Sequence, residues 1–135
     1  SSAQMLCFTD MLATFSAVSG AALADDAGPD SLNMLPVFLG DQPEDQPIRN
    51  SVVIPSGSGG FSIRLGDWKY INLIGSGGFS KPSRIKPTPG GPTGQLYNLK
   101  DDPDELNNLF QSNPEKVKKL ETEMARIRTA ATTRN

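Results

Sequence analysis

Few residues of this 135-residue chain are of types that do chemistry, and their inventory excludes several common mechanisms. The chain contains no histidine and a single cysteine, Cys7. Without histidine, serine–histidine and cysteine–histidine catalysis are excluded, and the commonest general base at neutral pH is missing. Cys7 lies in the apolar run 5–8, which indicates a small buried hydrophobe rather than a nucleophile, because a catalytic thiol needs a base or a cation beside it.

A second group of candidate residues lies in a long segment rich in glycine and proline, residues 75–94. Its composition favours a solvated linker, but a loop of this length without internal structure is uncommon unless it is functional or disordered. The alternative interpretation is therefore a loop that reaches toward an anionic ligand. In that case the contacting side chains would be those of Ser76, Lys81, Arg84 and Lys86.

The two glycine-rich stretches, residues 57–60 and 75–78, do not predict a phosphate-binding loop. Neither ends in Gly-Lys-Ser/Thr, and neither leads from a strand into a helix. The net charge is −2, with 13 basic and 15 acidic residues mixed along the chain, so we expect no nucleic-acid or anionic-membrane partner. No apolar run approaches the roughly 20 residues of a membrane span, and residues 5–18 lack the basic leader of a signal peptide.

The first forty residues predict two helices. The first has an apolar face with +3/+4 spacing and ends at Gly20. The second is short, begins with Asp30 or Ser31 as its cap and ends at Gly40. Residues 41–47 are a polar connector. The first apolar face is larger than the surface the rest of the chain offers to cover it; its residues are Met5, Phe8, Leu12, Phe15 and Val18.

The middle of the chain predicts an antiparallel sheet of about four short strands. Residues 51–54 form an apolar strand that ends at Pro55, and residues 61–65 and 68–73 alternate apolar and polar side chains. The connection Gly66-Asp67 is typical of a type I′ or II′ hairpin turn. A fourth strand is expected around residues 96–97, between Gly94 and Asn98.

The chain after this strand predicts a capped helical turn and then a long helix. Asp102 is placed to cap the turn, with Pro103 inside it and Glu105 reaching back to the cap amide. The long helix begins either with a Ser112/Glu115 capping box or with an Asn113 cap and Pro114. Residues 129–135 are expected to fray. The helix has one apolar stripe that is expected to pack on the sheet, with binding of a separate partner as the alternative; the stripe consists of Val117, Leu120, Met124 and Ile127.

Several of these segments, in this order, resemble the end of formylglycine-dependent sulfatases of the arylsulfatase A type, in particular bacterial carbohydrate sulfatases. The resemblance lies in residues 8–14 with Gly20, in the hairpin 61–71, in residues 75–80 and in residues 94–109. It implies an α+β fold in which residues 48–135 are the sulfatase C-terminal subdomain. Residues 1–47 would then be a helical remnant leading out of the large catalytic domain.

The resemblance also implies where the chemistry lies. The family's nucleophile is a formylglycine made from a cysteine or serine, but Cys7 is followed by Phe-Thr-Asp and not by the family's proline and arginine. Formylglycine and calcium are therefore expected in the missing catalytic domain, with no catalytic or metal-binding residue and no cofactor in this chain, which alone is predicted to be inactive. The expected partners are that domain and a sulfated saccharide, in a periplasmic or extracellular protein.

Two hypotheses follow from the sequence. In the first, the chain is a truncated C-terminal portion of a sulfatase, whose role is to complete the substrate cleft. In the second, it is a stand-alone, non-catalytic binding module. The first predicts that the apolar face of the first helix is exposed, forms a dimer or is mispacked, whereas the second predicts that this face is buried within the monomer.

Overall fold

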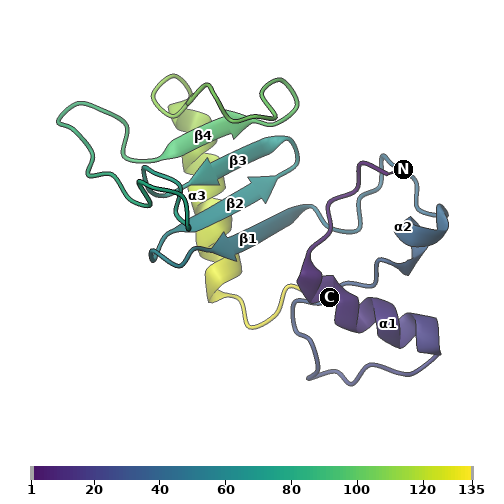
Figure 1. The fold of residues 1–135 in the computed structure, drawn as a ribbon. Helices are drawn as coiled ribbons and strands as arrows, with labels where there is room; N and C mark the ends of the chain where they lie inside the picture. The colour runs from purple at the N-terminus through teal and green to yellow at the C-terminus, as the bar shows by residue number, and fades with distance from the viewer. Residues whose placement is uncertain (1, 135) are drawn as a thin grey trace. The chain divides into compact units, whose positions relative to one another are not determined.

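The computed structural model describes residues 2–134, which form two compact units (Figure 1). The helical unit, Ser1–Asn50 with Thr129–Asn135, and the sheet unit, Ser51–Arg128, together confirm the predicted α+β class. The predicted division after residue 47 refers to domains of a larger protein and stays a prediction. The helical unit contains η1 (Phe8–Asp10), α1 (Met11–Ser19) and α2 (Leu35–Leu39), and the sheet unit contains β1 (Ser51–Pro55), β2 (Phe61–Leu65), β3 (Trp68–Ile71), β4 (Gln95–Asn98) and α3 (Pro114–Thr129).

The sheet has four antiparallel strands in the order β1-β2-β3-β4, as predicted. Its register places one row of side chains across all four strands, because Val53 pairs with Ile63, Ile63 with Tyr70, and Tyr70 with Leu96. Three members of this row are buried. Neighbouring strands therefore present their apolar side chains at the same level on one face.

The hairpin between β2 and β3 has the predicted two-residue turn. Leu65 pairs with Trp68, and Gly66 has a φ of +58°. Glu105 is the one non-glycine residue with positive φ in the described part of the chain, so Asp67 has negative φ. A positive φ at the first turn position alone fits type II′ and excludes type I′.

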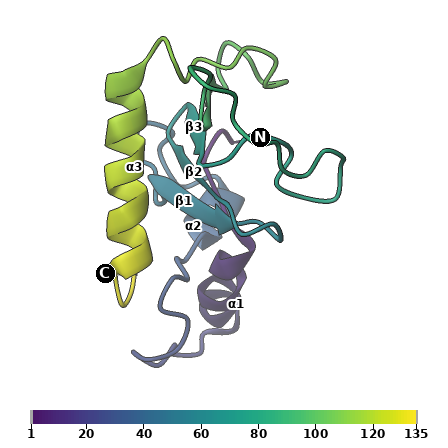
Figure 2. The ribbon, with the colours of Figure 1, turned by 90° about the vertical axis from the view of Figure 1, so that its left-hand side faces the viewer.

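Helix α3 packs along one face of the sheet (Figure 2). Val117, Leu120 and Met124 are buried in one cluster with the sheet row, and Ile127 packs against it. The predicted stripe and its partner are both confirmed. At the start of the helix the carbonyl of Asn113 accepts the first helical hydrogen bond from the Val117 amide at 3.1 Å, so Asn113 is the cap and Pro114 the first residue.

The helical unit confirms the two predicted helices and their ends, because Gly20 and Gly40 both close a helix in the left-handed conformation. The predicted start of the second helix was wrong. Helix α2 begins after Met34. Ser31 cannot cap it, since its Oγ accepts a hydrogen bond from the Ala13 amide at 2.8 Å.

The segment after β4 is a turn without a helix, which corrects the predicted capped helical turn. Asp102 accepts hydrogen bonds from the amides of Leu106 (3.0 Å) and Asn107 (2.8 Å), four and five residues on, whereas a helix cap binds amides two or three residues on. Glu105, however, has a φ of +58°, which ends helical geometry, and its carboxylate pairs with Lys69 Nζ at 2.6 Å. The ion pair with β3 replaces the predicted contact with the cap amide.

Residues 132–134, after α3, are bound rather than frayed, contrary to the prediction for this part of the chain, and residue 135 lies outside the described residues. The amide of Thr133 donates to Pro29 O and to Asp30 Oδ1, each at 3.1 Å. Arg134 Nη2 donates to the carbonyls of Ala24 at 3.0 Å and Asp25 at 2.8 Å. These partners lie about a hundred residues earlier in the chain, which is why local sequence patterns did not indicate them.

Candidate functional site

The four predicted ligand-contacting residues lie on one segment that leaves the sheet after β3 and returns to it at β4 (Figure 1). Lys81, Arg84 and Lys86 are exposed, and so is Ser76. Residues 75–94 contain no aspartate or glutamate. The segment is therefore a cationic surface on a chain whose net charge is negative.

Backbone hydrogen bonds fold the first half of this segment into a hairpin-like loop. Ile74 and Ile85 form an isolated β-bridge, with the Ile85 amide donating to Ile74 O at 2.8 Å. Beyond the bridge, the amide of Ser76 donates to Pro82 O at 3.1 Å and that of Gly77 to Ser83 O at 2.9 Å. The composition favoured an unstructured linker for this segment. The backbone pairing shows that its first half is structured instead.

Gly75 is the position where a side chain would break this pairing. Its φ is +109°, a value that L side chains rarely adopt, and a Cβ there would lie 2.9 Å from the carbonyl oxygens of both Pro82 and Ser83. The close approach of the two arms thus requires glycine.

The loop is braced by the turn between β1 and β2. Ser58 Oγ donates to Gly77 O at 3.2 Å, and Arg84 Nη1 donates to Ser58 O at 3.4 Å. The two glycine-rich stretches that failed as phosphate loops therefore lie side by side. At the base of the loop, Gln95 Nε2 donates to Leu73 O and Gly75 O, both at 2.9 Å.

The structure brings Ser76, Lys81 and Arg84 together on the hairpin-like loop, whereas Lys86 lies beyond the Ile74–Ile85 bridge. The Ser76 hydroxyl donates to Ser80 O at 2.5 Å and accepts from the Gly78 amide at 3.2 Å. Its role in the structure is to organise the tip of the loop. The three cations are the groups available to an anion, and their contact with a ligand stays a prediction.

One sequence feature of this loop was missed. Residues 80–84 read Ser-Lys-Pro-Ser-Arg, which has the serine-x-proline-x-arginine spacing of the family's nucleophile motif. Here the stretch lies in an exposed bend that does not lead into a helix, and Ser80 O is bonded to Ser76 Oγ. Residues 2–134 also contain no group of three or more His, Cys, Asp or Glu side chains that could hold a metal ion. The described residues thus do not fit the calcium and formylglycine centre of the family, and we assign no catalytic step to Ser80.

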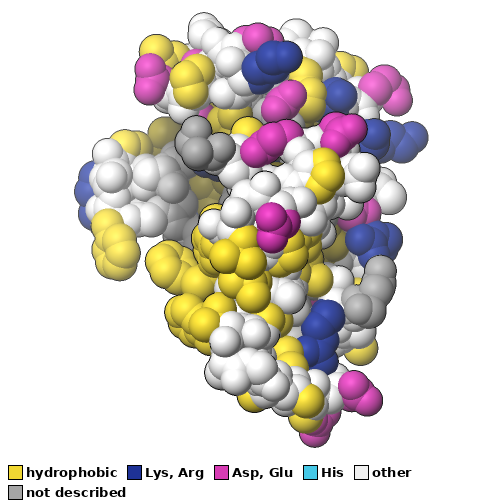
Figure 3. Space-filling view, turned by 90° about the vertical axis from the view of Figure 1, so that its right-hand side faces the viewer, with side chains coloured by type: hydrophobic (Ala, Val, Ile, Leu, Met, Phe, Trp, Pro, Cys, Tyr) yellow, Lys and Arg dark blue, Asp and Glu magenta, His cyan; other side chains and the backbone are white. Residues whose placement is uncertain are grey.

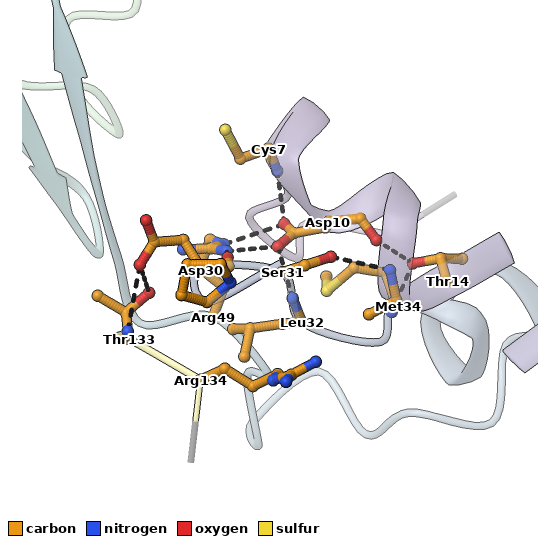
Figure 4. A network of polar contacts seen from close by, with 12 residues as sticks. Cys7, Asp10, Thr14, Asp30, Ser31, Leu32, Met34, Arg49, Thr133 and Arg134 are labelled. Atoms are coloured by element: carbon orange, nitrogen blue, oxygen red, sulfur yellow. Dashed lines mark hydrogen bonds and ion pairs between the residues drawn. The ribbon is translucent and has the colours of Figure 1, made fainter. Parts of the chain in front are cut away.

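The helical unit contains a buried polar network (Figure 4). The Asp10 carboxylate, fully buried, pairs with the Arg49 guanidinium, whose Nε donates to Asp10 Oδ2 at 3.0 Å. It also accepts hydrogen bonds from the amides of Cys7 at 2.8 Å and Leu32 at 3.0 Å. Arg49 Nη2 donates to Asp30 O at 2.8 Å. These hydrogen bonds join segments that are distant in the sequence. Since the polar groups of the network are paired with one another, they are not available to bind a ligand.

Cys7 is half-buried and lies beside this network. Its amide donates a hydrogen bond to Asp10 Oδ2 at 2.8 Å.

No helix among residues 2–134 has the length and apolarity to cross a membrane.

Comparison with known proteins points to one class: a curated relative of this chain is named as a sulfatase, and a solved structure with the same fold is described as a putative sulfatase. Both match this chain over only about a quarter of their own length, in their C-terminal part. The relative is an N-acetylgalactosamine-6-O-sulfatase of Bacteroides thetaiotaomicron, 29% identical over 120 residues. The match covers 89% of this chain but only 23% of the relative. No protein-family model matches the chain.

Two solved structures illustrate the shared fold. One comes from work on glycosaminoglycan metabolism by Bacteroides thetaiotaomicron, with 28% identity and a TM-score of 0.68 over 90% of this chain and 24% of that one. The other is a protein in complex with its substrate D-glucosamine-2-N,6-O-disulfate, with 21% identity and a TM-score of 0.58 over 88% and 23%. This chain therefore corresponds to about a quarter of each of these proteins.

Proposed function

We propose that this chain completes a sulfatase that hydrolyses sulfuric esters of a carbohydrate. The observation that carries the proposal is the exposed, acid-free cationic loop of residues 75–94 on a subdomain whose relatives are sulfatases. The 6-O-sulfated N-acetylgalactosamine in the relative's name makes a sulfated hexosamine the first substrate to test. A stand-alone module is less favoured, because the matched relatives are about four times longer than the region they share with this chain.

The exposed face of the helical unit supports docking onto the rest of such an enzyme. Phe8, Phe15 and Val18 expose 91%, 64% and 63% of their surface, and Figure 3 shows hydrophobic side chains gathered into a patch on the surface. Burying each such side chain is worth roughly 1.5–3 kcal/mol, so a contiguous exposed group of them indicates an interaction surface. The occupant we propose is the remaining three-quarters of the sulfatase, rather than a second copy of this chain.

The catalytic groups belong to that remaining part in this proposal. The proposed enzyme carries its formylglycine and calcium there, as the family that the chain resembles does, and the whole enzyme is exported to the periplasm or the cell exterior. This chain's own contribution is to bind and orient the substrate. Arg84 can offer two parallel N–H donors to a sulfate, and Lys81 and Lys86 add compact charges.

Binding of a sulfated sugar by the chain tests the loop's role. We expect 6-O-sulfated N-acetylgalactosamine to shift NMR signals of residues 75–94, and the unsulfated sugar to shift them far less. The triple variant K81A/R84A/K86A should lower the affinity roughly tenfold, since each exposed charge contact is worth about 0.5 kcal/mol.

The matched control is K100A/K118A/K119A, which removes three exposed cations from elsewhere on the sheet unit. It should leave the affinity nearly unchanged. Equal losses in the two variants, or equal shifts with sulfated and unsulfated sugar, would show that the loop is not a sulfate-recognising surface.

A further inference from the structure

Phe79 is the most exposed large hydrophobic side chain of the described residues, and it lies at the tip of the cationic loop, between the paired residues 76–77 and 82–83. It is fully exposed, and it stands between Gly78 and Ser80, two residues before Lys81. An aromatic ring left entirely in water contributes nothing to the packing of the sheet unit. Its position therefore needs an explanation outside the folded core.

The backbone on both sides of Phe79 is held by one hydroxyl group. Ser76 Oγ accepts from the amide of Gly78 at 3.2 Å and donates to the carbonyl of Ser80 at 2.5 Å. Just beyond, the Ser76 and Gly77 amides bind the carbonyls of the return arm. The ring is thus presented on a hydrogen-bonded turn, which lowers the entropy that a ligand would have to remove on binding.

The surroundings of Phe79 combine an apolar ring with positive charge. Lys81 and Arg84 follow it on the same loop, and no acidic residue occurs between positions 75 and 94. A sulfated sugar has matching chemistry, because a pyranose ring exposes a face of C–H groups while its sulfate ester carries a negative charge. An aromatic face is suited to the first, and a guanidinium or ammonium to the second.

We propose that Phe79 is the stacking platform for the pyranose ring of the sulfated saccharide, with Lys81 and Arg84 contacting its sulfate and Ser76 positioning the tip. This inference rests on the proposed function and deepens it, since it names the residue that recognises the sugar rather than the sulfate. Specificity for a sulfated sugar over inorganic sulfate would then come from Phe79.

The other conceivable occupant of Phe79 is the surface of the remaining sulfatase. The observations favour the sugar, because the exposed face of α1 offers a contrast. Helix α1 contains no charged residue, as expected of a surface that packs on another protein part, whereas the segment 75–94 around Phe79 contains three cations and no acidic residue. A contact that only holds two parts of a protein together does not require several positive charges without any negative one.

The test compares three ligands by NMR titration: 6-O-sulfated N-acetylgalactosamine, the unsulfated sugar and inorganic sulfate. Phe79→Ala should weaken binding of the sulfated sugar about three- to tenfold, while the weaker affinity for inorganic sulfate stays unchanged. Phe79→Trp should restore the sugar affinity. Leu106→Ala, which truncates a side chain that is 79% exposed on the same unit, is the matched control and should change neither affinity.

The outcomes separate the two proposals. If Phe79→Ala binds the sulfated sugar like the wild type while K81A/R84A/K86A does not, the stacking role is wrong and the proposed function stands. If the wild type binds no sulfated sugar, both are overturned. In the complete enzyme, a loss of thermal stability in Phe79→Ala with no change in KM would assign the ring to a contact between protein parts and overturn the stacking role.

Discussion

Replacing Asp10 by alanine is expected to destabilise the helical unit by about 3–5 kcal/mol, because it leaves the Arg49 guanidinium buried without its counter-charge. The same change removes the acceptor of the Cys7 and Leu32 amides. Hydrogen exchange resolved by residue should show loss of protection in α1 and retention in the strands of the sheet unit.

The control for this variant is Asp26→Ala, which removes an exposed carboxylate from the same unit. Its effect should lie within about 0.5 kcal/mol. Equal effects of the two substitutions on the hydrogen-exchange protection of α1 would contradict this prediction. The buried Asp10–Arg49 ion pair would then not be the contact that holds the N-terminal segment to the residues before β1.

The same carboxylate gives the helical unit an acid dependence. Burial by itself raises the pKa of Asp10, but hydrogen bonds from Arg49 and from the Leu32 and Cys7 amides outweigh burial and hold the pKa below its ordinary value of 3.8. The unfolded chain therefore takes up the proton first as pH falls. The stabilisation is complete above the ordinary pKa and is lost as pH falls through the lower folded value, a dependence that Asp10→Ala should lack.

Truncation of Leu120 to alanine is expected to cost the sheet unit about 2–5 kcal/mol. Leu120 is fully buried in the cluster formed by α3 and the row of side chains across the sheet. Urea unfolding followed by fluorescence of Trp68, the single tryptophan, reports on this unit, and the midpoint should fall markedly.

Lys118→Ala, an exposed substitution two residues earlier on the same helix, supplies the comparison. It should leave the urea midpoint nearly unchanged, because surface changes away from packed features are usually within about 0.5 kcal/mol. A Leu120→Ala midpoint close to that of Lys118→Ala would mean that α3 does not depend on the sheet for its stability.

The sheet unit was predictable because its signals are local. Three short patterns each specify an element: the Gly66-Asp67 turn, the alternation in β2 and the apolar stripe of α3. The sheet and the helix then each have one large apolar face, and these faces pack together. The details that were wrong depend on distant partners. Ser31 binds Ala13 instead of capping α2, and Glu105 binds Lys69 instead of its own turn.

The candidate site was predictable in part. Composition indicated the cations of residues 75–94, but it did not indicate that the loop pairs with itself or that the 56–60 turn braces it. Nor did it indicate the position of Phe79, because the exposure of a side chain depends on how the loop folds. The Gly-Ser-Gly-Gly run before Phe79 was the available signal, since a serine hydroxyl among flexible residues readily organises a turn.

The exposed face of the first helix is the point on which the two sequence hypotheses differ most. The structure leaves Phe8, Leu12, Phe15 and Val18 exposed, as the sulfatase-portion hypothesis predicted. The matched relatives are about four times longer than the region that they share with this chain. In the proposed function, the part outside this region supplies the surface that covers the exposed face.

The most direct test of this account is the DNA sequence that lies upstream of the codon for Ser1. We expect the reading frame to continue upstream through several hundred codons and to encode a second cysteine- or serine-x-proline-x-arginine motif, together with histidines that this chain lacks. A start codon immediately before Ser1, with no such frame beyond it, would contradict the account and favour a stand-alone module.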